Sequence, residues 1–142
     1  MFSRIDSSGD PKNAERPGFI DTIAAATSLN EDDNGKIFAL NAAAGAEIGL
    51  PAVADIEAGW GVRFYTAAAF ATTDWTIVSA TNVIQGHALV DGAHVAGIDE
   101  NTISFVATAE SVGDFVDVFF DGTNFIAFGS GVTSGSITFT AP

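Results

Sequence analysis

The sequence predicts an all-β domain, either an antiparallel sandwich, a jelly roll or an open barrel, preceded by an extended N-terminal arm. Short apolar or alternating runs recur at roughly 8 to 12 residue spacing, turn signals containing glycine or asparagine separate them, and helical periodicity is nearly absent. Because 142 residues fit a single domain, we expect residues 1–17 to form the arm and residues 18–142 to form one β domain.

The segment 1–17, MFSRIDSSGDPKNAERP, mixes charged residues, serine, glycine and two prolines without a sustained period. This composition is typical of an extended or disordered segment. The segment also lacks the apolar stretch of a secretion signal, so none is expected. We expect the arm either to be an unstructured terminus or to become ordered against a neighbouring subunit.

The chain is acidic, with 18 acids against 5 bases and a formal net charge of -13. Nucleic-acid binding needs a basic stripe, so a nucleic-acid partner is not expected. Four of the five bases lie within the first 36 residues, which leaves a strongly acidic body. That charge either docks the body on a basic surface or keeps a hydrophobic protein in solution.

Hydrophobic residues make up 47% of the chain and include 12 phenylalanines, more apolar material than a monomer of this size is expected to bury. This surplus suggests an oligomer. No apolar run approaches the ~20 residues of a membrane helix, so no membrane partner is expected. The chain has no cysteine, which excludes disulfides and thiolate metal sites and leaves stability to packing and subunit contacts.

The first predicted strand covers residues 19–29, which are mainly apolar and lie between Gly18 and an acidic turn; a helix is the alternative. The turn, residues 30–35, matches the start of an EF-hand loop, but Asn41 stands where the bidentate glutamate is required. A polar β-turn with Gly35 at positive φ is therefore favoured.

The pattern of residues 34–51 predicts a β-hairpin, because apolar runs at 37–40 and 46–50 flank a loop of small residues. The two strands of this hairpin are expected to pair directly. After the proline that closes the second strand, about one helical turn is expected, and Gly59 ends it.

Residues 60–67 and 74–80 alternate apolar and polar positions, as strands with one buried face do. In the first strand one face carries Trp60, Val62 and Phe64. Arg63 lies on the other face, where an ion pair with one of the acids is favoured over binding of an anionic ligand.

The only two histidines lie in a predicted hairpin, residues 83–96, whose Asp91-Gly92 dipeptide suits a two-residue turn. That turn pairs Leu89 with His94, so His87 and His94 lie on one face, on a diagonal. Two histidines could bind zinc, but zinc sites use three or four protein ligands and no third is indicated. We therefore expect ordinary surface or subunit-interface histidines, with no metal and no other cofactor.

The C-terminal part is rich in phenylalanine. Strands are expected at residues 102–107, 115–120 and 125–128 and in the final SITFTAP, with Asp121-Gly122 as a hairpin turn. Because apolar residues interrupt the alternation within 115–120, parts of this strand are expected to be covered on both faces. The glycine segment that follows 125–128 has neither a lysine nor a following helix, so no phosphate loop is expected.

The succession of these motifs resembles a recurrent pattern of phage virion proteins. It runs NGKIFALNAAAGAEIGLPAVADIEAGWGVRFY, then WTIVSATNVIQGHAL, then GDFVDVFFDGTNFIAFGSG, and covers about residues 34 to 130. The chain looks like the small capsid decoration, or cement, proteins of tailed phages, and head-fibre and tail-associated β-domains share the pattern. The aromatic residue after Asp-Gly, often tryptophan in such patterns, is Phe125 here.

By this resemblance the chain would be a structural virion protein, not an enzyme, on the outer surface of the capsid. It would bind the major capsid protein as a homotrimer and bridge neighbouring shell subunits. The arm is long enough to cross an adjacent subunit at roughly 3.3 Å per extended residue. The candidate capsid-contact residues of the arm are Phe2, Arg4, Ile5, Lys12, Arg16 and Pro17, and the candidate subunit-interface or surface residues are Arg63, His87 and His94.

Two other functions remain open from the sequence. A host-receptor or glycan-binding module of a phage head fibre or tail could use Trp60, Tyr65 and Trp75 as a stacking platform, although core tryptophans are favoured. A virion-associated hydrolase could use Asp114 and Asp117 as paired carboxylates, but isolated acids on turns and strand surfaces are usually solvated.

Overall fold

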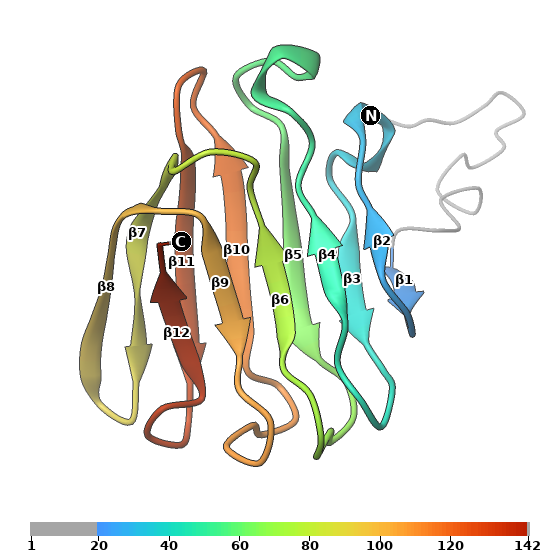
Figure 1. The fold of residues 1–142 in the computed structure, drawn as a ribbon, viewed down its shortest axis with the longest axis vertical. Coiled ribbons are helices and arrows are strands. Elements are labelled where there is room, and N and C mark those ends of the chain that lie inside the picture. The colour runs from blue at the N-terminus through green and yellow to red at the C-terminus, as the bar shows by residue number, and fades with distance from the viewer. Residues whose placement is uncertain (1–19, 142) are drawn as a thin grey trace, which may run out of the picture.

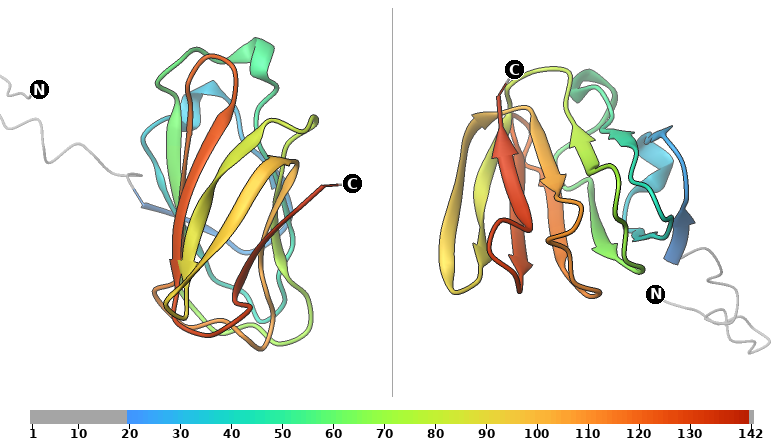
Figure 2. Two further views of the ribbon diagram at one scale, coloured as in Figure 1. Left: turned by 90° about the vertical axis from the view of Figure 1, so that its left-hand side faces the viewer. Right: turned by 60° about the horizontal axis from the view of Figure 1, so that its bottom comes forward.

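Residues 20–141 are described by a computed structural model, in which two β-sheets pack face to face (Figure 1). The predicted all-β, sandwich-like class is confirmed. Two single-turn 3-10 helices, η2 (Glu31–Asp33) and η3 (Val53–Asp55), are the only helices in this part of the chain. Seen from the side, the two layers enclose a single core between them (Figure 2).

The larger sheet has seven strands in the order β1-β3-β5-β10-β11-β7-β8. Their bounds are β1 Ile20–Ile23, β3 Ile37–Leu40, β5 Gly61–Thr66, β10 Phe115–Phe120, β11 Phe125–Gly131, β7 Ile84–Val90 and β8 Ala93–Glu100. The smaller sheet has five strands in the order β12-β9-β6-β4-β2. Their bounds are β12 Ile137–Thr140, β9 Thr102–Phe105, β6 Trp75–Val78, β4 Glu47–Gly49 and β2 Thr27–Ser28.

Both sheets are mixed, although the sequence pattern predicts antiparallel pairing. β1, β3 and β5 are parallel neighbours in the larger sheet, and β2, β4 and β6 are parallel neighbours in the smaller one. From β1 to β6 the chain changes sheet after every strand, so it returns to each sheet running in the same direction. Among the C-terminal strands, β7–β8, β10–β11 and β9–β12 are antiparallel pairs, whereas β11 and β7 are parallel neighbours.

The predicted hairpin at residues 34–51 is wrong, because β3 and β4 belong to different sheets. The small residues between them form a crossover, not a tight reversal. At Gly45 the backbone N–H donates to the carbonyl of Thr73 over 2.9 Å, and a Cβ there would collide with the backbone of Asp74. Gly45 is therefore needed for close backbone approach between two loops.

The predicted strand at residues 19–29 is also divided. β1 and β2 lie in different sheets, and the alanines between them carry the chain across. Two short turns have the positive φ that was predicted for their glycines: Gly35, which ends the acidic turn that contains η2, has φ +85°, and Gly59 has φ +101°. In the acidic turn the side chain of Asn30 accepts from the N–H of Asp32 at 2.8 Å, as in a helix cap.

The two C-terminal hairpins follow the predictions closely. Asp91 and Gly92 have φ of +50° and +76°, and they join β7 to β8 with Val90 opposite Ala93. The β10–β11 turn is closed by Asp121, whose carboxylate accepts from the N–H groups of Thr123 and Asn124. The hydrogen bond from Asn124 has the largest effect on the pKa of Asp121, which it lowers, and the hydrogen bond from Thr123 lowers this pKa further.

The core lies between the inner faces of the two sheets and follows from strand alternation. In the larger sheet the fully buried side chains include Phe64, Val116 and Phe125, and in the smaller sheet they include Trp75, Ile77, Ile103 and Phe105. Because one side of every long strand is used in this way, the other side forms the outer face of the molecule.

Candidate interaction surface

The candidate residues of the sequence fall into two groups. Those of the arm, from Phe2 to Pro17, lie outside the described residues. Arg63, His87 and His94 are described, and all three lie on the outer face of the seven-stranded sheet. The described candidate residues therefore share one face of the molecule.

The register of the seven-stranded sheet places these side chains in neighbouring rows. Arg63 of β5 is opposite Asp117 of β10, which is opposite Phe128 of β11, which is opposite His87 of β7. Paired residues of adjacent strands point to the same side of a sheet. The row therefore crosses four strands on the outer face.

Aromatic and imidazole rings form a continuous line on this face. The ring centroids are 5.3 Å apart for His94 and His87, 5.3 Å for His87 and Phe128, and 6.4 Å for Phe128 and Phe119. We call His94, His87, Phe128 and Phe119 the aromatic strip. Phe119 and Phe128 are 40% and 44% exposed, so the strip is open to a partner.

Aliphatic side chains extend the apolar surface beside the aromatic strip. Leu89 of β7 is directly opposite His94 and is 45% exposed. Ile98 of β8 is 69% exposed. Several exposed apolar side chains near one another mark a contact site more often than an isolated one does.

The charged pair on this face is neutralised internally. Arg63 donates from Nε and from a terminal nitrogen to the two carboxylate oxygens of Asp117, at 2.5 and 2.8 Å. Its guanidinium carbon lies 4.6 Å from the ring centroid of Phe115, and the hydrogen bonding with Asp117 raises the pKa of Arg63. Both side chains are well exposed, so the pair adds little stability, but it compensates the charge of Asp117.

The ion pair predicted for Arg63 is thus confirmed. Lys36, the other described base of the N-terminal half, lies between two acids, with Asp21 at 2.9 Å and Asp33 at 3.1 Å. Hydrogen bonds to these two carboxylates raise its pKa. Neither cation is left available as an anion site.

The outer face of the five-stranded sheet has a different composition. One row across it consists of Thr138, Ser104, Thr76 and Glu47, and a second row consists of Thr140, Thr102, Val78 and Gly49. No aromatic side chain points outward from the paired positions of these described strands. Small hydroxyl and β-branched residues pack side by side there and give a solvated sheet surface.

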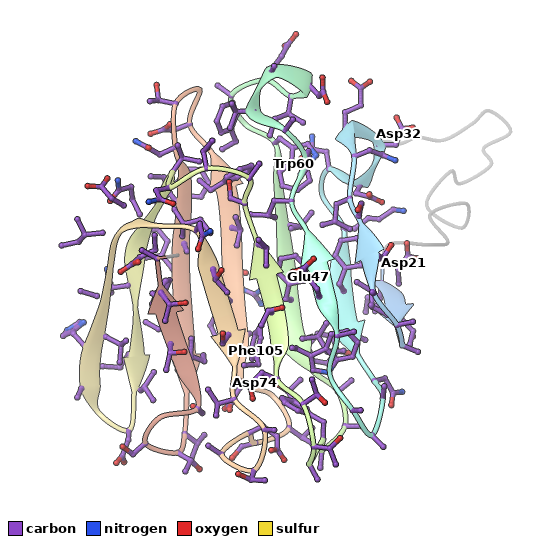
Figure 3. The ribbon with its side chains drawn as sticks, viewed as in Figure 1. Asp21, Asp32, Glu47, Trp60, Asp74 and Phe105 are labelled. Carbon is purple, nitrogen blue, oxygen red and sulfur yellow. The ribbon has the colours of Figure 1, made fainter. Side chains whose placement is uncertain are left out.

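The tryptophans do not form a surface platform. Trp60 and Trp75 are 4% and 0% exposed, which confirms that both are core residues. Trp60 lies at one end of the sandwich, near the turn that contains Asp32 (Figure 3), and its indole N–H donates to the carbonyl of Asn30 at 3.2 Å. Of the three residues proposed for glycan stacking, only Tyr65 reaches the outer face, where it is half-buried.

The two aspartates considered for hydrolysis are engaged separately. Asp114 is 2% exposed, and its carboxylate accepts from the N–H groups of Ser111 and Val132 at 2.9 and 3.1 Å. It therefore ties two loops to the start of β10. Asp117 is bound to Arg63 on the outer face, so the two carboxylates do not share one site.

Sequence reasoning missed the exposure of Phe119 and Phe128. It predicts that parts of the strand 115–120 are covered on both faces, but within the single chain only Val116, Val118 and Phe120 of this strand are buried in the core. Phe119 has an odd position in a strand whose even positions face the core, and this alternation is the signal that could have revealed its exposure. Phe119 therefore points away from the core and is 40% exposed.

Comparison with protein-family models, curated proteins and solved structures finds no significant match. Within residues 20–141, no three or more side chains of His, Cys, Asp or Glu gather as a metal site would require. No helix of this part has the length and apolar character that crossing a membrane demands. What the described surface offers is an apolar, aromatic contact area.

Proposed function

We propose that this chain is a structural virion protein, a capsid decoration protein of a tailed phage. In this role it binds the outer surface of the head as a homotrimer and bridges neighbouring subunits of the major capsid protein. The observation that carries the proposal is the aromatic strip, an exposed contact surface on an all-β domain in which no catalytic constellation is assembled from the described residues.

The aromatic strip has the composition of a subunit interface. Interface cores are enriched in aromatic residues and depleted in charge, and a few large side chains carry most of the binding energy. Phe119 and Phe128 have this character, with the two imidazole rings and Leu89 beside them. We assign the strip to the contact between copies in the trimer.

Charge supports self-association on this particular face. Copies with a formal net charge of -13 repel one another. Among the outward-facing residues of β5, β10, β11 and β7, all within the described chain, the one carboxylate is Asp117, and Arg63 neutralises it. The part of this face that carries Phe119 and Phe128 therefore adds little to the repulsion between copies. On the neighbouring strand β8, Asp99 accepts a hydrogen bond from the side chain of Gln85.

Attachment to the shell is assigned to the arm, residues 1–17, as the resemblance implies. Three arms on one trimer would act together, since linked binding sites gain affinity through effective concentration. Modest contacts per arm would then suffice for stable bridging. This part of the proposal depends on the sequence alone.

The second candidate, a host-receptor or glycan-binding module, has less support. Its expected platform required Trp60 and Trp75 on the surface, and both are buried. The exposed rings of the aromatic strip are phenylalanines and histidines, which lack the broad indole face that suits sugar stacking.

The test uses expanded phage heads that lack decoration protein, with the purified full chain added. We expect the wild-type protein to sediment with the heads and to appear in electron micrographs at threefold positions on the shell. A variant without residues 1–17 is expected to remain trimeric but to lose head binding. Trimers that bind neither expanded heads nor any other virion component would overturn the proposal.

A further inference from the structure

The two histidines of the aromatic strip are the side chains of the described surface best suited to bind an ion. His87 lies on β7 and His94 on β8, and both are exposed. Leu89 is opposite His94, and His87 is opposite Ala96, so the histidines are diagonal neighbours on one face. Their ring centroids are 5.3 Å apart, with the ring planes inclined by 65°.

The scaffold under the two rings is well defined. The Asp91-Gly92 turn fixes the register of β7 and β8, and both residues have the positive φ that a tight hairpin turn needs. On its other side the ring of His87 meets the edge of Phe128, at 5.3 Å between centroids and 85° between planes. His87 is thus held between Phe128 and His94.

The separation of the rings fits two ligands of one metal ion. A metal lies about 2.0–2.1 Å from each ligating imidazole nitrogen, which places it about 3.2 Å from each ring centroid. Two imidazoles at a tetrahedral angle around such an ion have centroids about 5.2 Å apart by the same geometry. The observed centroid separation of 5.3 Å matches this spacing, so rotation of the two exposed side chains would direct one nitrogen of each ring to a shared ion.

We propose that His87 and His94 form a two-histidine chelate for a divalent transition-metal ion. Imidazole suits Cu²⁺, Ni²⁺ and Zn²⁺, whereas Ca²⁺ and Mg²⁺ prefer oxygen ligands. Once one histidine has bound, the second acts at high effective concentration, which strengthens binding over a single histidine. The inference rests on the single chain and not on the proposed virion function; in a trimer joined through the aromatic strip, the ion would lie at the contact between copies.

This site differs from the zinc site that the sequence argues against. A closed structural zinc site needs three or four protein ligands, and no such group occurs among residues 20–141. A chelate with two protein ligands leaves the other coordination positions to water, as the exposure of both histidines permits. Its affinity is accordingly moderate and its ion exchangeable.

The test is titration of the full chain with CuCl₂, NiCl₂, ZnCl₂ and MgCl₂ by isothermal calorimetry in a buffer that does not bind metals. We expect one ion per chain, with Cu²⁺ bound more tightly than Ni²⁺ or Zn²⁺ and Mg²⁺ not bound at this site. In amide NMR spectra, substoichiometric Cu²⁺ should broaden the signals of β7, β8 and the adjacent part of β11.

Three variants locate the ligands. His87→Ala and His94→Ala are each expected to weaken binding by about tenfold or more, because a single histidine cannot chelate. The variant His94→Ala/Ala93→His keeps two histidines but moves one to the opposite side of the hairpin, and it should bind as weakly as His94→Ala. Circular dichroism checks that each variant is folded. Absence of Cu²⁺ binding by the wild-type chain, or binding that all three folded variants retain, would overturn the chelate.

Discussion

The two outer faces of this sandwich differ, although the same alternation of strands produces both. On the inner sides the sheets are alike, with aromatic and aliphatic residues such as Phe64, Phe125, Trp75 and Ile77 in one core. On the outer sides the five-stranded sheet presents threonine and serine, and the seven-stranded sheet presents the aromatic strip. Folding requires apolar inner faces but not an apolar outer one.

The difference indicates which outer face is suited to water and which is suited to contact with a partner. The rows around Ser104 and Thr76 carry hydroxyl side chains that can face water, although Ser104 itself is only 9% exposed. Phe119 and Phe128 keep 40% and 44% of their surface exposed. Burying them in a contact would gain roughly 25 cal/mol for each Å² of apolar area removed from water.

The first prediction concerns the strand pairing that builds each face. Gly86→Ala should lower the free energy of unfolding by about 3 kcal/mol, because Gly86 has φ +137° and a Cβ would collide with the carbonyl of Ala127. This contact joins β7 to β11, and with it His87 to Phe128. Urea unfolding followed by tryptophan fluorescence measures the loss.

The matched control for that prediction lies in the five-stranded sheet. Gly49→Ala in β4 would meet only the side chain of Ser28, with its Oγ at 3.4 Å, an ordinary contact. We expect a change within about 1 kcal/mol. Equal costs for the two variants would show that Gly86 is not a point of close approach between strands.

The second prediction tests whether the aromatic strip is the contact between copies. Phe119→Ser/Phe128→Ser should weaken self-association by about 100-fold or more, since central aromatic residues of an interface commonly contribute about 2 kcal/mol or more each. Sedimentation velocity over a range of protein concentrations measures the oligomer. The corresponding pair on the other face, Thr76→Ala/Thr138→Ala, should leave the oligomer intact; dissociation by both pairs to the same extent would remove the distinction between the faces.

The third prediction isolates the charge of the contact face. Arg63→Ala leaves the carboxylate of Asp117 without its bidentate partner, and self-association should weaken by about 3- to 10-fold. Stability of the single chain should change by less than about 1 kcal/mol, because both side chains are well exposed. The double variant Arg63→Ala/Asp117→Ala should restore most of the association; if it does not, the pair acts through specific contacts and not through net charge.

Sequence reasoning located the hairpins but not the crossovers, for a physical reason. Asp91-Gly92 and Asp121-Gly122 predict reversals of the chain through residues that accept positive φ, and both hairpins form. For the first of them the predicted register is also confirmed. Between β1 and β6 each connection passes from one sheet to the other. Small residues serve such a crossover as well as a turn, so residues 34–51 suggest a hairpin that does not form.

The candidate surface was likewise predictable only in part. Register from the Asp91-Gly92 turn placed His87 and His94 on one face, as the structure confirms. The parallel pairing of β7 with β11, which brings Phe128 beside His87, joins segments about forty residues apart. No local signal specifies such a pairing, so the aromatic strip follows from topology and not from a motif.

The smallest expected effect tests whether the hydroxyl rows of the five-stranded sheet have any role in assembly. Thr76→Val and Thr138→Val keep the branched shape and strand preference of threonine while removing its hydroxyl. Stability should change by no more than about 0.5 kcal/mol, and the oligomeric state should not change at all. Thermal unfolding and sedimentation at matched concentrations measure both.

If one valine on this face were enough to create a new association, exposed apolar area alone would drive assembly. The arrangement of rings in the aromatic strip would then not explain why copies associate through that face. If neither valine does so, the strip is distinguished by the continuity of its four rings, which a single apolar substitution cannot reproduce.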